Sequence, residues 1–202
     1  MSELAVAGVE QPEVPMDRDT KVIFGFWVYI MTDCVLFASL FATYAVLHNN
    51  TNGGLSGRDL FSLPYILTET MLLLTSSFTC GLAMLAMHRA QVRKLVTWLG
   101  VTFILGASFL GMELKEFHSL AVEGNSWHRS GFLSSYFTLV GTHGLHITIG
   151  LLWMVIVVWQ LRRRGLTCGA IRRLTLLSMF WHFLDIVWIF IFTIVYLLGA
   201  LR

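Results

Sequence analysis

Charged residues are scarce in this sequence, where Asp, Glu, Lys and Arg together make up 13% of the 202 residues. A soluble domain carries about a quarter, so this composition excludes an ordinary water-soluble globular protein. Hydrophobic residues instead account for 56% of the chain, which indicates a membrane protein. The net charge of +2 is too small to indicate a nucleic-acid partner, and none is expected.

Cysteine is also rare, and its spacing excludes the usual cysteine sites. The three cysteines, Cys34, Cys80 and Cys168, lie far apart and form no C-x-x-C motif. We therefore expect reduced packing residues, with no disulfide and no cysteine-bound metal.

The first 20 residues lack the apolar core and the basic start of a signal peptide. They contain two of the three prolines and five acidic residues: Glu3, Glu10, Glu13, Asp17 and Asp19. We interpret residues 1–20 as a mobile cytoplasmic tail, and residues 21–202 as a five-helix transmembrane domain.

Long apolar runs dominate the remaining sequence. They cover residues 22–47, 64–88, 94–118, 131–161 and 172–200. Each is long enough to cross about 30 Å of hydrocarbon as a helix that rises about 1.5 Å per residue. The sequence therefore predicts an all-α, polytopic membrane protein built as a bundle of five transmembrane helices.

Basic residues gather in alternate connections of this bundle. One side would hold Arg18, Lys21, Arg89, Arg93, Lys94, Arg162, Arg163, Arg164, Arg172 and Arg173. The other side would hold Arg58, Lys115, Arg129 and Arg202. Because cytoplasmic loops are enriched in Lys and Arg, this asymmetry predicts a cytoplasmic N-terminus and a periplasmic C-terminus.

Histidines and acids interrupt the apolar runs. His143 and His146 share one helix face at i,i+3, and so do His182 and Asp185. Since His143 and His182 fall at similar depth, they would face each other if their helices are antiparallel neighbours. We expect His143, His146, His182 and Asp185 to form an interhelical polar network.

Acidic residues inside a membrane often mark proton paths or functional clefts. Four are candidates for proton support or for lining a lipid cleft: Asp33, Glu69, Glu113 and Asp185. Glu113 lies close to Glu116, and this pair is interpreted as interfacial.

The residues alone leave three functions open. The histidines and a carboxylate suit a transition metal or haem, hydrogen bonds between helices, or proton handling. On the hydrogen-bonding interpretation, Asp185→Leu leaves His182 without a partner and loosens the bundle by about 1–2 kcal/mol.

Five stretches resemble subunit III of haem–copper respiratory oxidases. They are residues 26–33 (FWVYIMTD), 67–77 (LTETMLLLTSS), 111–117 (GMELKEF), 142–147 (THGLHI) and 180–188 (FWHFLDIVW). The resemblance extends from Lys21 to the C-terminus. It favours the five-helix, quinol-oxidising cytochrome o branch of that family, with the bacterial cytochrome c oxidase branch as the alternative. A more distant alternative is a self-sufficient intramembrane haem- or metal-binding protein.

The resemblance also implies a function and its partners. A terminal oxidase of this family oxidises quinol, reduces oxygen to water and pumps protons in the bacterial inner membrane. Its haem and copper would belong to partner subunit I, so this chain would have no catalytic residue, metal or cofactor of its own. It would contact subunit I mainly, with subunits II and IV and phospholipids as further partners, and would support assembly, stability and proton uptake. Asp33 matches the family's buried, carbodiimide-reactive carboxylate, which is Glu in the mitochondrial form.

Overall fold

The computed structural model describes residues 18–48, 63–122, 130–197 and 199. It contains five long helices: α1 (Arg18–Leu47), α3 (Leu63–His88), α4 (Val92–Val122), α5 (Gly131–Arg164) and α6 (Cys168–Ile191). The last helix continues into a π-helical segment, η1 (Phe192–Leu197). All five helices are long and apolar enough to cross a membrane. The expected all-α, five-span fold is confirmed, and the described residues contain no strand.

The helix bounds differ from the expected runs mainly at the ends. Helix α1 begins at Arg18, so residues 18–20 are helical rather than part of a tail, while the rest of that tail lies outside the described residues. Helix α4 extends beyond residue 118 to Val122. Helix α6 begins before residue 172 because the Thr167 hydroxyl accepts a hydrogen bond from the backbone N–H of Ala170, which caps the helix.

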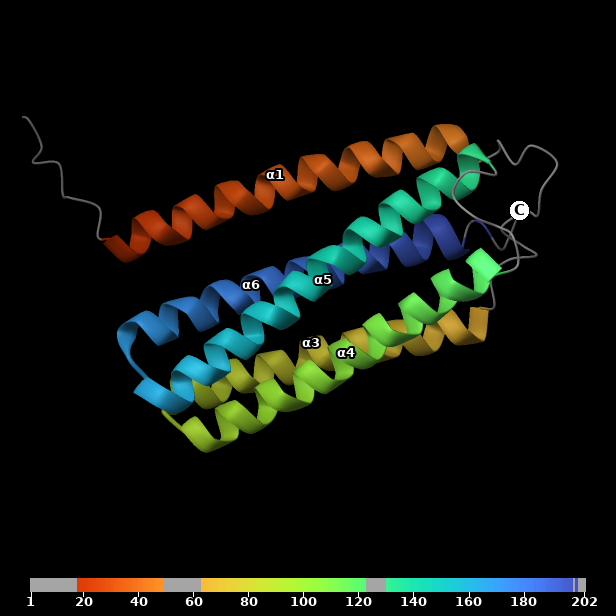
Figure 1. Cartoon of the computed structure of the whole chain (residues 1–202). Coiled ribbons are helices and arrows are strands. Elements are labelled where there is room, and N and C mark those ends of the chain that lie inside the picture. Colours follow the sequence, from red (N-terminus) through yellow and green to blue (C-terminus); the bar gives the residue numbers. More distant parts are fainter. Residues whose placement is uncertain (1–17, 49–62, 123–129, 198, 200–202) are drawn as a thin grey trace, which may run out of the picture.

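Helices α5 and α6 lie between α1 on one side and the α3–α4 pair on the other (Figure 1). Helix α1 packs on α5 and α6, whereas α3 packs on α4 and α6, and α4 also contacts α5. The buried side chains form one apolar cluster to which all five helices contribute. Helices α5 and α6 therefore form the middle of the bundle, each in contact with three other helices.

Two tryptophans fix α6 against the other helices. The indole N–H groups of Trp181 and Trp188 donate to the hydroxyls of Ser76 and Thr70 on α3, each at 3.2 Å. Both tryptophans are almost fully buried. They therefore fill the core and do not line an open lipid cleft.

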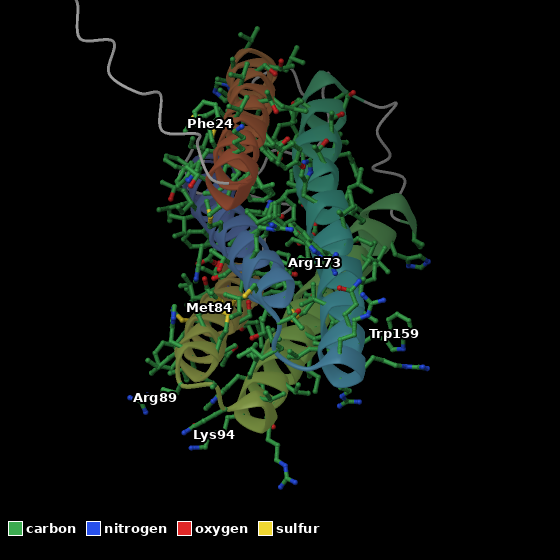
Figure 2. The ribbon with its side chains drawn as sticks, turned by 90° about the vertical axis from the view of Figure 1, so that its left-hand side faces the viewer. Phe24, Met84, Arg89, Lys94, Trp159 and Arg173 are labelled. Atoms are coloured by element: carbon green, nitrogen blue, oxygen red, sulfur yellow. The ribbon has the colours of Figure 1, made fainter. Side chains whose placement is uncertain are left out.

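The basic residues gather at one end of the bundle. The start of α1, the α3–α4 turn and the α5–α6 connection all lie at the left-hand end of Figure 1. Figure 2 shows this end facing the viewer, with Arg89, Lys94 and Arg173. The fold thus brings together the basic groups that the sequence assigned to the cytoplasmic side, and the orientation itself stays a prediction.

Neutralising the arginines at the end of α5 tests that orientation. We expect replacement of Arg162, Arg163 and Arg164 by Gln to give a fraction of inverted chains, because the basic bias that holds this loop in the cytoplasm is reduced. Reporter fusions in the α5–α6 connection measure the fraction, and Lys115→Gln at the opposite end is the control. A topology identical to that of the unchanged chain would show that the remaining basic residues are enough to set the orientation of the chain in the membrane.

Candidate functional site

Three glutamates come together in the half of the bundle away from the basic end. Glu69 on α3 is 0% exposed and Glu113 on α4 is 2% exposed, although both side chains can carry charge. Each interacts electrostatically with Glu116, one turn beyond Glu113. Neither carboxylate oxygen of Glu69 or of Glu113 has a hydrogen-bond partner in the described parts of the chain. Among the described residues, this is the densest group of buried acids.

Tyrosines border the glutamate cluster. The Tyr136 hydroxyl donates a 3.1 Å hydrogen bond to Oε1 of Glu116. It also lies 2.9 Å from the Tyr196 hydroxyl of η1, so hydroxyl groups from α5 and η1 continue the cluster. Tyr65 on α3 donates to the backbone carbonyl of Met112 at 3.0 Å. The cluster thereby joins α3, α4, α5 and η1.

A glycine allows one of these carboxylates to reach the middle of the bundle. The Glu113 carboxylate lies against the backbone of α5 at Gly144, where an added Cβ would stand 2.8 Å from Oε1. Any side chain at this position would therefore displace the carboxylate. The sequence identified Glu113 as a candidate, but its interfacial interpretation did not anticipate this close packing against α5.

The glutamate cluster places acidic side chains close together in an apolar environment. In the low dielectric of a membrane protein, neighbouring negative charges repel strongly unless a cation or a proton lies between them. Within residues 18–48, 63–122 and 130–197, no basic side chain forms an ion pair with Glu69, Glu113 or Glu116. The arrangement is therefore suited to hold protons.

Asp33 and His146 form a second polar contact, between α1 and α5. Nε2 of His146 lies 3.7 Å from Oδ2 of Asp33, which is an electrostatic contact longer than a hydrogen bond. Nδ1 of the same ring lies 2.7 Å from the carbonyl oxygen of Thr142 and must donate, because a carbonyl only accepts. The ring is thus oriented with Nε2 towards the carboxylate, and Tyr29 also interacts with that carboxylate.

Ser77 on α3 links the other predicted pair. Its hydroxyl is hydrogen-bonded to Nδ1 of His182 at 2.7 Å and also interacts with the Asp185 carboxyl. His182 and Asp185 therefore meet through a serine of the neighbouring helix, although they share one face of α6. Sequence reasoning did not single out Ser77, and its only signal was a hydroxyl group within an apolar run.

His143 has a different environment from the one expected. It is 0% exposed, and neither ring nitrogen has a hydrogen-bond partner in the part of the chain that the structure describes. Its ring stacks on Trp188 with centroids 5.4 Å apart and meets the edges of Phe37 and Phe109. Helices α5 and α6 are neighbours, as predicted, but His143 packs against Trp188 rather than facing His182.

The three histidines consequently do not form a common site. His146 contacts Asp33, His182 contacts Ser77, and His143 lies among aromatic rings. Within the described part of the chain, no three His, Cys, Asp or Glu side chains are placed to hold a metal ion. The single expected network is thus divided into separate contacts, and the histidine set required by the metal-binding alternative is not assembled.

The shared serine changes the expected effect of mutation at Asp185. Because His182 keeps Ser77 as its partner, we expect Asp185→Leu to lower the free energy of unfolding by about 0.6 kcal/mol, the average for membrane hydrogen bonds. Ser77→Ala removes both contacts and should cost about 1–2 kcal/mol. Unfolding in mixed detergent micelles measures both, with Ser108→Ala as the control at an exposed hydroxyl. A larger loss for Asp185→Leu than for Ser77→Ala would contradict the shared-serine arrangement.

Comparison with known proteins gives a consistent set of relatives. The model of the family described as cytochrome c oxidase subunit III matches residues 17–200. The chain is 60% identical over 185 residues to cytochrome bo(3) ubiquinol oxidase subunit 3 of Pseudomonas aeruginosa, an alignment that covers 92% of this chain and 88% of that protein. It is 46% identical over 189 residues to quinol oxidase subunit 3 of Bacillus subtilis, with 92% and 93% covered. Cytochrome c oxidase subunit 3 of another Bacillus is 46% identical over 175 residues, with 87% and 84% covered.

Proposed function

The chain belongs to the cytochrome c oxidase subunit III family, and on this premise we propose that it works as a non-redox subunit of a bacterial terminal ubiquinol oxidase. Such an oxidase is an oxidoreductase complex. With five helices able to cross a bilayer, the chain is a multi-pass protein of the bacterial inner membrane. The observation that carries the proposal is the 60% identity over nearly the whole chain to a ubiquinol oxidase subunit 3.

The relatives favour quinol over cytochrome c as the electron donor of the complex. Two relatives named ubiquinol oxidase subunit 3, both from Pseudomonas, are 60% and 55% identical to this chain. The relative named cytochrome c oxidase subunit 3 is 46% identical over a shorter alignment. We therefore propose that the chain belongs to the quinol-oxidising branch. In this proposal haem and copper lie in partner subunit I, and subunits II and IV are also present.

The electron donor can be tested with the complex that copurifies with this chain. A tag on this chain is used to purify the assembly from membranes, and oxygen consumption is measured with ubiquinol and with reduced cytochrome c. We expect rapid oxygen consumption with ubiquinol alone. Activity with cytochrome c but not with ubiquinol would move the chain to the cytochrome c oxidase branch. Purification without any oxidase subunit would contradict membership of such a complex.

The contribution of this chain follows from its buried polar groups. Most of them interact across helices within the chain itself, as Asp33 does with His146 and Ser77 does with His182. These contacts hold the bundle in shape where lipid gives no hydrophobic drive for helix association. We propose that the chain supports assembly and durability of the oxidase, and that its buried carboxylates, including the glutamate cluster, assist proton uptake.

Asp33 allows the supporting role to be separated from a catalytic one. We expect Asp33→Asn to leave the initial turnover of the complex nearly unchanged and to hasten inactivation about fivefold. This estimate assumes that about 1 kcal/mol of the contact with His146 is lost from the barrier to inactivation. The decay of oxygen consumption with time measures it, and Cys34→Ala, at an exposed neighbour on the same helix, is the control. Complete loss of initial turnover would instead make Asp33 part of the catalytic machinery.

A further inference from the structure

His182 lies on the outer surface of the bundle, at the middle of a membrane-spanning segment. The segment is Cys168–Leu197, so residue 182 is close to its centre. The His182 side chain is exposed, whereas Asp185, one turn further along the same helix, is buried. Its neighbours along this face of α6 are the half-buried Met179 and the exposed Ile186. The structure therefore places an exposed imidazole ring within an apolar surface.

Exposed hydroxyl groups such as those of Thr75 and Ser108 differ from this imidazole. Each donates a hydrogen bond to the backbone carbonyl one turn earlier on its own helix, α3 or α4. Such a hydroxyl can face lipid at little cost, because its donor is already satisfied. Within the described residues, the one hydrogen bond of the His182 ring instead crosses to Ser77 on α3.

The contact with Ser77 leaves the second ring nitrogen of His182 available. Nδ1 lies 2.7 Å from the Ser77 hydroxyl, and that hydroxyl also interacts with the Asp185 carboxyl. A hydroxyl has a single hydrogen, so when Ser77 donates it to the carboxylate, Nδ1–H of His182 donates to the serine oxygen. Nε2 of the neutral ring is then an acceptor. The site therefore fits a hydrogen-bond donor from outside this chain.

Lipid does not supply a donor at this depth. The hydrocarbon core of a bilayer is about 30 Å thick, so the centre of a span lies about 15 Å from either headgroup level. Ionisable side chains within transmembrane segments almost always face protein or a water-filled cavity, because exposure to hydrocarbon is costly. The exposure of His182 therefore indicates that protein covers this face of α6 in the membrane.

The surface around His182 suits the packing of a further helix. Helices α1 and α3 pack on either side of α6, and the exposed face of α6 lies between them (Figure 1). Gly81, one turn from Ser77 on α3, is exposed, and an added Cβ there would meet no atom within 4 Å. Small residues allow helix backbones to approach closely in a membrane. Ile186, one turn from His182, adds apolar contact area.

We propose that this face of α6 binds a transmembrane helix of a partner subunit of the oxidase, and that a hydrogen-bond donor on that helix binds Nε2 of His182. The partner is a helix because only a helix satisfies its own backbone groups at this depth in contact with lipid. A second copy of this chain fits less well, since a twofold contact would bring two accepting rings together. The proposal rests on the proposed function, which supplies the partner subunit.

A photoreactive side chain tests which molecule covers this face. The substitution Ile186→p-benzoylphenylalanine is irradiated in native membranes, the tagged chain is purified, and its adducts are identified by mass spectrometry. We expect an adduct with an oxidase subunit. The same substitution at Ile104, which is 65% exposed at the middle of α4, is the control and should give lipid adducts. Adducts of position 186 with lipid alone, or with a second copy of this chain, would overturn the proposal.

Removal of the imidazole tests the hydrogen bond. We expect His182→Leu to make partner subunits dissociate from the tagged chain in detergent about threefold faster, which corresponds to about 0.6 kcal/mol for a membrane hydrogen bond. His182→Gln should restore the original rate, because its amide oxygen also accepts. Ser77→Ala removes the bond inside this chain but keeps the ring, so dissociation should be slower than for His182→Leu. Equal rates for Ser77→Ala and His182→Leu would overturn the contact with the partner.

The unchanged chain separates this proposal from the proposed function. If it purifies without oxidase subunits, the proposed function fails. The adducts formed at position 186 in native membranes then still show whether protein or only lipid covers this face of α6. The two failures are therefore distinguishable.

Discussion

Replacement of Gly106 by leucine is expected to abolish stable packing of the Trp181 side chain against α4. A Cβ at this position would stand 2.8 Å from two carbon atoms of the Trp181 ring, closer than van der Waals contact permits. The ring cannot move away easily, because it is 2% exposed, is packed on the other side by Gly150, and donates a hydrogen bond to Ser76. Overpacking of this kind costs about 1–3 kcal/mol for an added methylene group or two, and the whole leucine side chain should exceed that range.

The measurement for Gly106→Leu is the free energy of unfolding in mixed micelles, together with the amount of chain recovered with the complex. Gly111→Leu is the matched control on the same helix, because an added Cβ at Gly111 meets nothing within 4 Å. We expect normal recovery of the control and strong loss of the Gly106 variant. Similar stability of the two variants would show that Trp181 does not occupy the space beside Gly106.

Truncation of Trp188 to alanine should have the second large effect. This side chain is fully buried, stacks on His143, meets Phe109 edge to face with centroids 4.6 Å apart, and donates to the Thr70 hydroxyl. Removing a buried tryptophan leaves a cavity and costs about 3–5 kcal/mol. It would also expose one face of the His143 ring, which no hydrogen bond from the described residues holds in place.

Trp159→Ala provides the comparison for Trp188→Ala, because Trp159 is 58% exposed on the surface of α5. We expect a change in unfolding free energy within about 0.5 kcal/mol for this surface tryptophan, as for most surface substitutions. Trp188→Phe should recover part of the lost stability by restoring aromatic packing without the hydrogen bond. Equal losses for Trp159→Ala and Trp188→Ala would contradict the central position of α6.

The spans were predictable because the apolar runs dictate them directly. An apolar run such as residues 64–88 has to be helical in a bilayer, because in a helix the backbone N–H and C=O groups of the segment form hydrogen bonds with one another. The structure has α3 at Leu63–His88, almost the same range. The clustering of basic residues at one end was also predictable from the sequence. It requires only that successive connections lie at opposite ends of the bundle, and it does not depend on side-chain packing.

The partners of the buried polar groups were not predictable, because they depend on how each helix is rotated about its axis. The i,i+3 spacing indicated that His182 and Asp185 share a face, but not that this face meets Ser77. His143 and His146 point to different neighbours although they lie one turn apart on α5. Serine and threonine are common in membrane helices, so no sequence pattern distinguishes Ser77 from the other hydroxyl residues.

The assembly of the glutamate cluster could not be predicted from the sequence either. The sequence predicts an interfacial pair at Glu113 and Glu116, close to the end of the apolar run at residues 94–118. Helix α4 continues to Val122, and Gly144 allows the Glu113 carboxylate to pack against α5. The approach of Glu69 and Tyr136 from other helices depends on tertiary packing alone, which local sequence does not encode.

We propose that this chain is a supporting subunit that carries no redox group of its own. The most direct measurement is an optical spectrum with copper analysis of the purified complex, repeated on this chain after it has been separated from its partners. We predict haem and copper in the complex, and a separated chain that is colourless and free of copper while both groups stay with the large partner subunit. Haem or copper bound in stoichiometric amounts to the separated chain would show that this subunit carries a redox group itself.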